Sequence, residues 1–115
     1  MMVDVARKWA GGGAEGIHFI CPGCNEAHTV RTKPDSQRPR WSWNGSLSMP
    51  TLTPSVLLTD YKPSPDDNDR LNQDGTRKLI QYICHSFVTD GRIQFLSDCT
   101  HALAGQTVDL PPWRG

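Results

Sequence analysis

Hydrophobic residues occur along this chain in short runs that alternate with polar residues, and glycine, proline or aspartate separates the runs. Alternation with a period of two over four to eight residues is typical of β-strands that bury one face. The Asp90-Gly91 dipeptide between two such runs predicts a tight hairpin turn. The predicted strands cover residues 17–20, 28–32, 40–43, 56–59, 78–89, 92–98 and 106–110.

This pattern predicts a mostly β protein with small α content, folded as a compact antiparallel β domain. Either a partly open barrel or two packed sheets would be consistent with this strand pattern. One helical turn is expected at residues 100–104. A chain of 115 residues is enough for one domain. We expect residues 1–16 to form a loosely ordered N-terminal arm, residues 17–115 to form the single domain, and residues 62–78 to form a mobile polar loop.

The charge balance excludes an overall basic field, because Lys and Arg together number 12 and so do Asp and Glu. No apolar run approaches the ~20 residues of a membrane-spanning helix. The first residues lack the apolar core of a signal peptide. We therefore expect a reducing compartment, where the four cysteines act as metal ligands rather than as disulfides.

The sequence Cys21-Pro22-Gly23-Cys24 lies between two predicted strands, so it occupies the turn of a small hairpin. Two thiolates at this spacing can bind one metal ion, and zinc is the usual ion for such a pair. The alternative is a redox pair of the thioredoxin type, which should lead into a helix. This pair leads into a strand, which favours zinc.

Structural zinc is almost always four-coordinate, so two more ligands are needed. The candidates are Cys84, His85, Cys99 and His101. With a two-residue turn at 90–91, Cys84 faces Ser97 across the hairpin. Side chains alternate along strands, so Cys84, Cys99 and His101 then share a face and His85 points to the other.

Two further histidines lie near the first cysteine pair. His28 follows Cys24 closely enough to serve as a third ligand from this hairpin, but we expect His18 and His28 to flank the metal site instead.

The chain resembles a family of small phage and prophage proteins of unknown function, whose members often carry the label "ammonia monooxygenase". The resemblance covers residues 17–110. It rests on Cys21-Pro22-Gly23-Cys24, Trp43-Asn44-Gly45, the segment 50–55, Cys84-His85-Ser86-Phe87 and the segment 95–108.

The resemblance implies a small zinc-binding domain encoded by mobile DNA, with no established activity. In members of this family the position of Cys99 can be serine, whereas that of His101 stays histidine, which implies that His101 is the fourth ligand. The predicted zinc ligands are therefore Cys21, Cys24, Cys84 and His101, with Cys99 and then His85 as alternatives for the fourth position. We expect Asp98 to orient His101.

The oxygenase label conflicts with the residues present. A copper or iron oxygenase needs an open site rich in histidine or carboxylate. This chain has four histidines in all and no His-x-His pair. A thiolate-rich cluster suits a closed zinc site better.

The function predicted from these residues is non-enzymatic: a phage-derived zinc-binding accessory or interaction protein acting on a host macromolecule or a host-defence component. We expect it in the cytoplasm of a phage-infected or lysogenic bacterial host, with a protein partner. The hydroxyl residues have no evident base partner in the sequence and are predicted to belong to turns and strand edges; they are Thr51, Thr53, Ser55 and Ser86.

Two alternatives stay open. A zinc ion with only three protein ligands would make the chain a zinc-dependent hydrolase. A nucleic-acid-binding zinc module would contact nucleic acid through Arg38, Arg40, Trp41 and Trp43.

Overall fold

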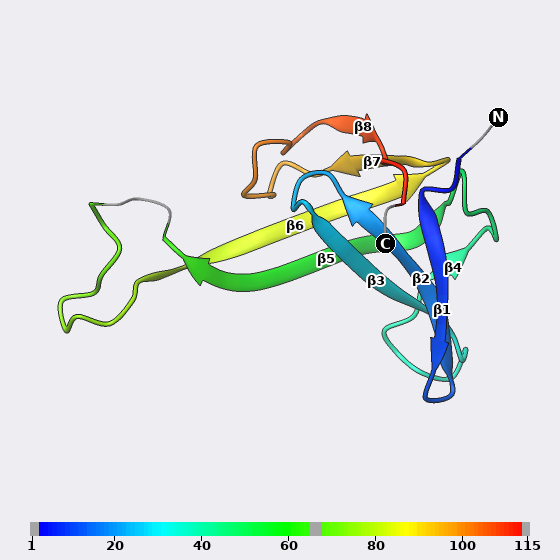
Figure 1. Ribbon diagram of the computed structural model, residues 1–115, viewed down its shortest axis with the longest axis horizontal. Helices are drawn as coiled ribbons and strands as arrows, with labels where there is room; N and C mark the ends of the chain where they lie inside the picture. The colour runs from blue at the N-terminus through cyan, green and yellow to red at the C-terminus, as the bar shows by residue number, and fades with distance from the viewer. Residues whose placement is uncertain (1–2, 65–67, 114–115) are drawn as a thin grey trace.

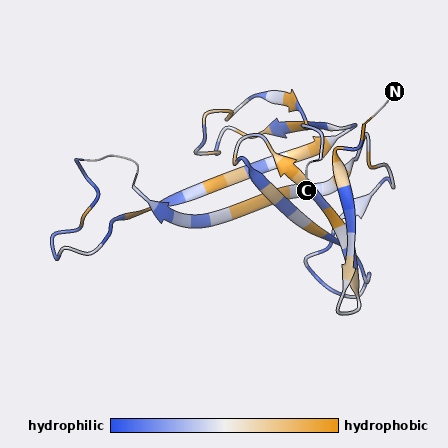
Figure 2. Cartoon of the chain, in the orientation of Figure 1, coloured by the Kyte–Doolittle hydropathy of each residue, from blue (hydrophilic) through white to orange (hydrophobic). Residues whose placement is uncertain are grey.

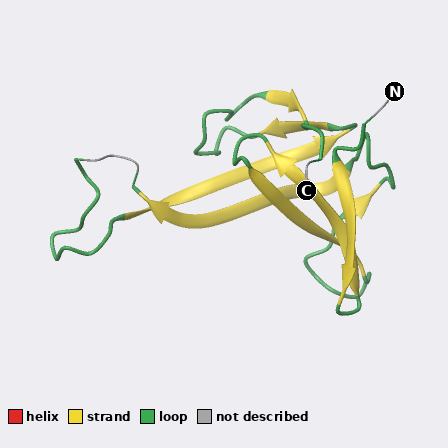
Figure 3. Cartoon of the chain, viewed as in Figure 1, coloured by secondary structure: helices red, strands yellow, loops and turns green. Residues whose placement is uncertain are grey.

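The computed structural model describes residues 3–64 and 68–113, and over these residues the chain forms two antiparallel sheets without a helix (Figure 3). The first sheet has the order β1-β2-β3, and the second has the order β4-β5-β6-β7-β8 (Figure 1). The strands are β1 (Ala6–Gly11), β2 (Ala14–Cys21), β3 (Glu26–Lys33), β4 (Ser42–Trp43), β5 (Leu52–Pro63), β6 (Leu79–Thr89), β7 (Arg92–Phe95) and β8 (Thr107–Asp109). The mostly β prediction is confirmed, whereas the helical turn expected at 100–104 is a non-helical turn.

The hydrophobic core lies between the inner faces of the two sheets. Ile17 and Phe19 of β2 and Val88 and Phe95 of β6 and β7 are all fully or almost fully buried in one cluster. Hydrophobic and polar residues alternate along these strands (Figure 2). Alternation therefore turns one row of side chains into the core and the other row outward.

The N-terminal segment differs from the prediction of a loosely ordered arm, because β1 pairs along its whole length with β2, from Ala6↔Phe19 to Gly11↔Ala14. Gly12 and Gly13 have φ angles of +60° and +80°, which suit a two-residue turn that joins antiparallel strands. Gly12 and Gly13 therefore form the turn of a hairpin. Residues 1–2 of the predicted arm lie outside the described residues.

Strands β5 and β6 form a long hairpin whose far end extends away from the rest of the chain (Figure 1). Pairing continues to Pro63↔Leu79, so residues 62–63 of the predicted loop belong to a strand. The expected mobility of this loop stays a prediction, and its residues 65–67 lie outside the described part. No helix among the described residues is long and apolar enough to cross a membrane.

The hairpin of β6 and β7 has the predicted register, with Ser86 opposite Phe95 and Thr89 opposite Arg92. Asp90 and Gly91 have φ angles of +51° and +78°, as a tight hairpin turn requires. The ladder ends at Phe95, earlier than predicted, so Cys84 does not face Ser97.

The segment after β7 runs beside β6, but it contains more residues than the stretch of β6 to which it is hydrogen-bonded. The Leu96 N–H donates to His85 O at 2.9 Å, and the Thr100 N–H donates to Ile83 O at 2.9 Å. Four steps along this segment therefore match two steps along β6, so residues 97–98 bulge outward. We call residues 96–100 the clamp segment.

Candidate active site and metal centre

Three side chains on the outer face of the second sheet form a hydrogen-bonded series. The His85 Nε2 lies 2.9 Å from the Ser55 hydroxyl, and the His85 Nδ1 lies 3.1 Å from Asp98 Oδ2. With the proton on Nδ1, this nitrogen donates to the carboxylate and Nε2 accepts from the hydroxyl. A serine, a histidine and an aspartate in this arrangement can perform nucleophilic catalysis. We call these residues the Ser55 triad.

A bulge in β5 positions the serine. The pairs Leu52↔Val88 and Val56↔Ser86 enclose four steps on β5 but only two on β6. Extra residues bend a strand and re-aim its side chains. Ser55 lies at the end of this bulge, and its carbonyl accepts a hydrogen bond of 3.1 Å from the Trp41 indole.

The clamp segment positions the histidine and the aspartate. The His85 N–H donates to the Cys99 sulfur at 3.2 Å, and the Cys99 thiol lies 3.1 Å from His85 O. Asp98 precedes Cys99 and lies in the outward bulge of the clamp segment, which places its carboxylate beside the His85 ring. Cys99 therefore connects the backbone of His85 to the clamp segment, which carries Asp98.

The triad is open to solvent on its outer side. The exposed fraction of the side chain is 24% for His85 and 52% for Asp98. The His85 and Asp98 side chains are therefore accessible to solvent, and Ser55 is half-buried. The arrangement can transfer an acyl group from a substrate to Ser55.

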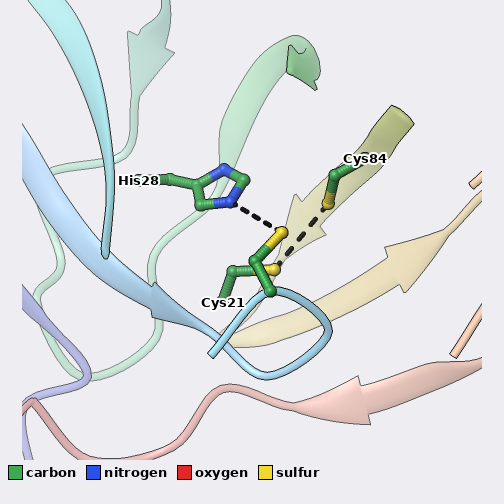
Figure 4. A group of neighbouring side chains, drawn as sticks. Cys21, His28 and Cys84 are labelled. Carbon is green, nitrogen blue, oxygen red and sulfur yellow. Dashed lines mark hydrogen bonds between the residues drawn. The ribbon is translucent and has the colours of Figure 1, made fainter. Parts of the chain in front are cut away.

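A second group of side chains lies on the opposite, inner side of β6. It consists of Cys21 at the end of β2, Cys24 in the following turn, His28 of β3 and Cys84 of β6, and its ligand atoms all lie within 4.8 Å of one another. We call it the thiol cluster. Figure 4 shows the His28 imidazole and the sulfurs of Cys21 and Cys84 turned toward one another.

The distances in the thiol cluster fit one tetrahedral ion. The sulfurs of Cys21 and Cys84 are 3.8 Å apart, and His28 Nε2 is 3.3 Å from the Cys24 sulfur. A tetrahedral zinc with Zn–S distances of ~2.3 Å separates two sulfurs by about 3.8 Å. The cluster could therefore hold a metal ion with three thiolates and one imidazole.

Contacts within the cluster change the acidity of its thiols. The hydrogen bond from Cys84 lowers the pKa of Cys21 to about 4, and the same contact raises the pKa of Cys84. Burial raises the pKa of Cys24, which also accepts a hydrogen bond of 2.9 Å from the Tyr82 hydroxyl. One ionised thiol in the absence of metal gives an ion a point of first attachment.

Asn25 and Gly23 explain the conformation of the turn that carries Cys21 and Cys24. Asn25 takes a φ of +57°, and its N–H donates to Cys21 O at 2.8 Å, which closes the turn. A Cβ at Gly23 would collide with the His101 ring. A residue without a side chain at 23 therefore lets His101 pack against the turn.

The structure places the predicted zinc ligands in two overlapping groups. Cys21, Cys24 and Cys84 are together, and His28 joins them; Cys99 and His101 form a second group with Cys84. The His101 Nδ1 accepts from the Leu103 N–H at 3.2 Å, and its Nε2 is buried with no hydrogen-bond partner among the described residues.

Two expectations about the other predicted residues are corrected. Asp98 pairs with His85 rather than with His101, because residues 97–98 bulge to the outer face. His85 points away from the thiol cluster, as strand alternation predicted, and contacts Ser55 there. The statement that Ser55 lacks a base partner is therefore wrong.

The residues proposed for nucleic-acid contact have partners within the chain. The indole N–H of Trp41 donates to Ser55 O and that of Trp43 to Ser46 O, and both residues are half-buried. Arg40 lies 3.7 Å from Asp35, and Arg38 donates to the backbone at Asp35. Nucleic-acid binding stays a prediction.

Sequence reasoning missed the triad because its serine lies thirty positions before its histidine. The alternation along β6 did place His85 outward. The triad depends on the pairing of β5 with β6 and on the bulge at the start of β5. No local sequence pattern predicts either of these features.

Comparison with known proteins identifies a family. A family model described as "Bacterial ubiquitination-like system serine protease (BubE)" matches residues 4–96. Neither the search of curated proteins nor the search of solved structures gave a match. The chain belongs to this bacterial family of ubiquitination-like system serine proteases. The predictions of a non-enzymatic interaction protein, and of a chain that is not an enzyme, are therefore wrong.

Proposed function

We propose that this protein is a serine protease in which Ser55 is the nucleophile, His85 the general base and Asp98 the residue that orients the base. Its substrate would be a protein carrying a peptide or isopeptide bond made or processed by a bacterial ubiquitination-like system. The family description supports the reaction class. The single observation that carries the assignment is the series of contacts at 2.9 and 3.1 Å through the His85 ring.

The proposed reaction uses His85 Nε2 first as a general base and then as a general acid. The Ser55 hydroxyl attacks the carbonyl carbon of the scissile bond while its proton passes to His85 Nε2. The leaving amine takes that proton when the C–N bond breaks, which leaves the acyl group as an ester on Ser55. Water then attacks the ester carbonyl and gives a proton to His85 Nε2. When the bond between the acyl carbon and Ser55 Oγ breaks, His85 Nε2 returns this proton to Ser55 Oγ, and the carboxylic acid is released.

Asp98 has two effects in this scheme. Its carboxylate accepts the Nδ1–H, so the ring presents an unprotonated Nε2 to the serine. The same negative charge stabilises the imidazolium that forms when the serine proton is transferred. Removal of the charge should therefore slow acylation without removing the nucleophile.

We further propose that the thiol cluster binds one structural zinc through Cys21, Cys24, His28 and Cys84. The tetrahedral fit of the distances and the hydrogen bond from Tyr82 to Cys24 support this ligand set. A bound zinc would supply a crosslink between the two sheets. Four protein ligands leave no open coordination position on the zinc. This ligand set therefore favours serine chemistry over a zinc-dependent hydrolase.

Compartment and origin follow as proposals of the same kind. The described cysteines are free thiols, which favours the reducing interior of a bacterial cell. The resemblance to phage and prophage proteins favours a gene carried on mobile DNA. The proposed protein partner is the substrate itself.

A fluorophosphonate probe tests the nucleophile directly, because it forms a covalent bond with an activated serine. The wild-type protein should gain one adduct, and mass spectrometry should place it on the peptide containing Ser55. The Ser55→Ala variant should gain none, whereas the Ser42→Ala variant, which changes an exposed serine of β4, should react like wild type. The Asp98→Asn variant should react roughly 10²–10⁴-fold more slowly.

An adduct that persists at wild-type rate in Ser55→Ala protein would contradict the assignment. Equal rates for Asp98→Asn and wild type would remove Asp98 from the mechanism while leaving Ser55 in place.

A further inference from the structure

An exposed row of large hydrophobic side chains lies on the same face as the Ser55 triad. The exposed fractions are 55% for Leu57, 66% for Tyr61, 53% for Leu79 and 41% for Phe87. Positions 55, 57 and 61 of β5 and 79, 85 and 87 of β6 are separated by even numbers of residues, so their side chains share one face. We call these four hydrophobic residues the apolar strip.

Contacts of the intervening residues agree with this alternation. The Lys62 ammonium lies 4.1 Å from the centre of the Tyr82 ring and 3.7 Å from Glu26 of the first sheet. Cys84 belongs to the inner thiol cluster. Even-numbered positions here therefore face the first sheet, and the apolar strip faces outward.

One end of the apolar strip lies beside Ser55 and His85. Leu57 is paired directly with His85 in the ladder, and Phe87 is the next outward residue of β6 after His85. An acyl group carried to Ser55 is therefore flanked by Leu57 on one side and by Phe87 on the other. Contact with either side chain would remove apolar surface from water.

The strip continues along the protruding hairpin to its far end. The outward positions between the triad and the hairpin end are Thr59, Gln81 and Ile83, none of which carries a charge. At ~3.3 Å per residue, Leu57 and Tyr61 lie about 13 Å apart, which equals the spacing of residues i and i+4 in an extended chain. An uncharged face of this length, with large apolar side chains at Leu57, Tyr61 and Leu79, suits an extended segment with hydrophobic side chains.

We propose that the apolar strip is the substrate-docking surface, and that its occupant is an extended polypeptide segment with hydrophobic side chains on the acyl side of the scissile bond. This inference rests on the proposed serine protease function. Continuity with Ser55 and His85 identifies the occupant, because a chain that lies on Leu57 and Phe87 is already in position for attack. Leu57 and Phe87 thereby determine specificity.

A series of p-nitrophenyl esters measures the part of the strip beside the serine. For wild-type protein, kcat/KM should rise from acetate to butyrate to hexanoate, by about three- to fourfold for each methylene that becomes buried. In the double variant Leu57→Ser, Phe87→Ser the rise should disappear, so that kcat/KM for hexanoate no longer exceeds kcat/KM for acetate. Leu71→Ser removes another exposed leucine, one that is 62% exposed in the loop after β5, and should keep the full rise.

Peptide binding to Ser55→Ala protein tests the rest of the strip without any reaction. A labelled ten-residue peptide that alternates leucine with threonine should bind at least tenfold more tightly than one that alternates serine with threonine. The double variant Tyr61→Ser, Leu79→Ser, made in the Ser55→Ala protein, should lose this preference. Leu71→Ser, made in the same Ser55→Ala protein, should keep the preference for the leucine peptide.

The outcomes separate the two proposals. Ester hydrolysis that survives Ser55→Ala would contradict the protease function, whatever the peptides do. A full rise with ester length after loss of Leu57 and Phe87, or equal binding of the two peptides, would overturn the docking surface alone. A dimer in sedimentation that dissociates in the Leu57→Ser, Phe87→Ser variant would show instead that a second copy of the chain covers the strip.

Discussion

Removing the proposed zinc ion from the thiol cluster should greatly lower the melting temperature of this protein. The proposed ligands come from β2, the turn after it, β3 and β6, so one ion joins the first sheet to the second. Cys21 and Cys84 contact each other across 63 positions of sequence. A bound ion therefore closes a long loop that is open in the unfolded, metal-free chain.

The size of the effect follows from the length of that loop. A crosslink that closes a loop of this length lowers the conformational entropy of the unfolded chain, which raises the free energy of the unfolded state by about 4 kcal/mol at 25 °C. Unfolding entropy of ~2.1 cal/mol/K per residue gives about 0.24 kcal/mol/K for the whole chain. The melting temperature should then fall by roughly 15–20 °C when the ion is removed.

Differential scanning fluorimetry with a strong zinc chelator measures this shift, and elemental analysis of the same samples gives the metal content. Addition of zinc after removal of the chelator should restore the original melting temperature. The Cys21→Ser variant is the matched control, because chelation should change its melting temperature little further. A chelated wild-type protein that melts within about 3 °C of the untreated one would refute the crosslink.

Two further predictions concern single side chains beside the triad and the cluster. His28→Ala should reduce zinc retention at least tenfold more than His101→Ala, measured by competition with a chromophoric chelator; the reverse order would make His101 the fourth ligand. Cys99→Val should lower kcat for an ester substrate about tenfold or more at unchanged KM, because it removes the hydrogen bonds that connect the His85 backbone to the clamp segment, and Cys99→Ser should recover much of the loss. Equal kcat values for Cys99→Val and wild type would show that the clamp segment holds Asp98 without this thiol.

Much of the second sheet could be predicted from sequence because its signals are local. Asp90-Gly91 fixes the register of the hairpin, and the alternation on either side of the turn fixes which residues are buried. The same reasoning placed Cys84 inward and His85 outward. The cysteine pair at positions 21 and 24 was placed on its turn for the same reason, since both ends of that hairpin are visible in a short stretch of sequence.

The parts that could not be predicted depend on contacts between distant segments. Ser55 reaches His85 only because β5 pairs with β6 through a bulge, and the segment Thr53-Pro54 that precedes the serine gives no indication of its partner strand. Asp98 was assigned to His101 because it is the nearest carboxylate to that histidine in the sequence. The clamp segment instead places the Asp98 carboxylate beside the His85 ring on the outer face.

The alternation of side chains along β6 explains how a small β domain can present both the thiol cluster and the Ser55 triad. Cys84 and His85 are neighbours in sequence, yet one points to the inner thiol cluster and the other to the outer triad. The clamp segment repeats the arrangement, since Cys99 bonds the backbone of β6 while its neighbour Asp98 holds the His85 ring. An ion bound by Cys84 would therefore restrain the backbone of His85 from the inner side, while Cys99 restrains it from the edge. Because His85 and Asp98 are partly exposed, the geometry of the triad depends on these restraints as well as on packing.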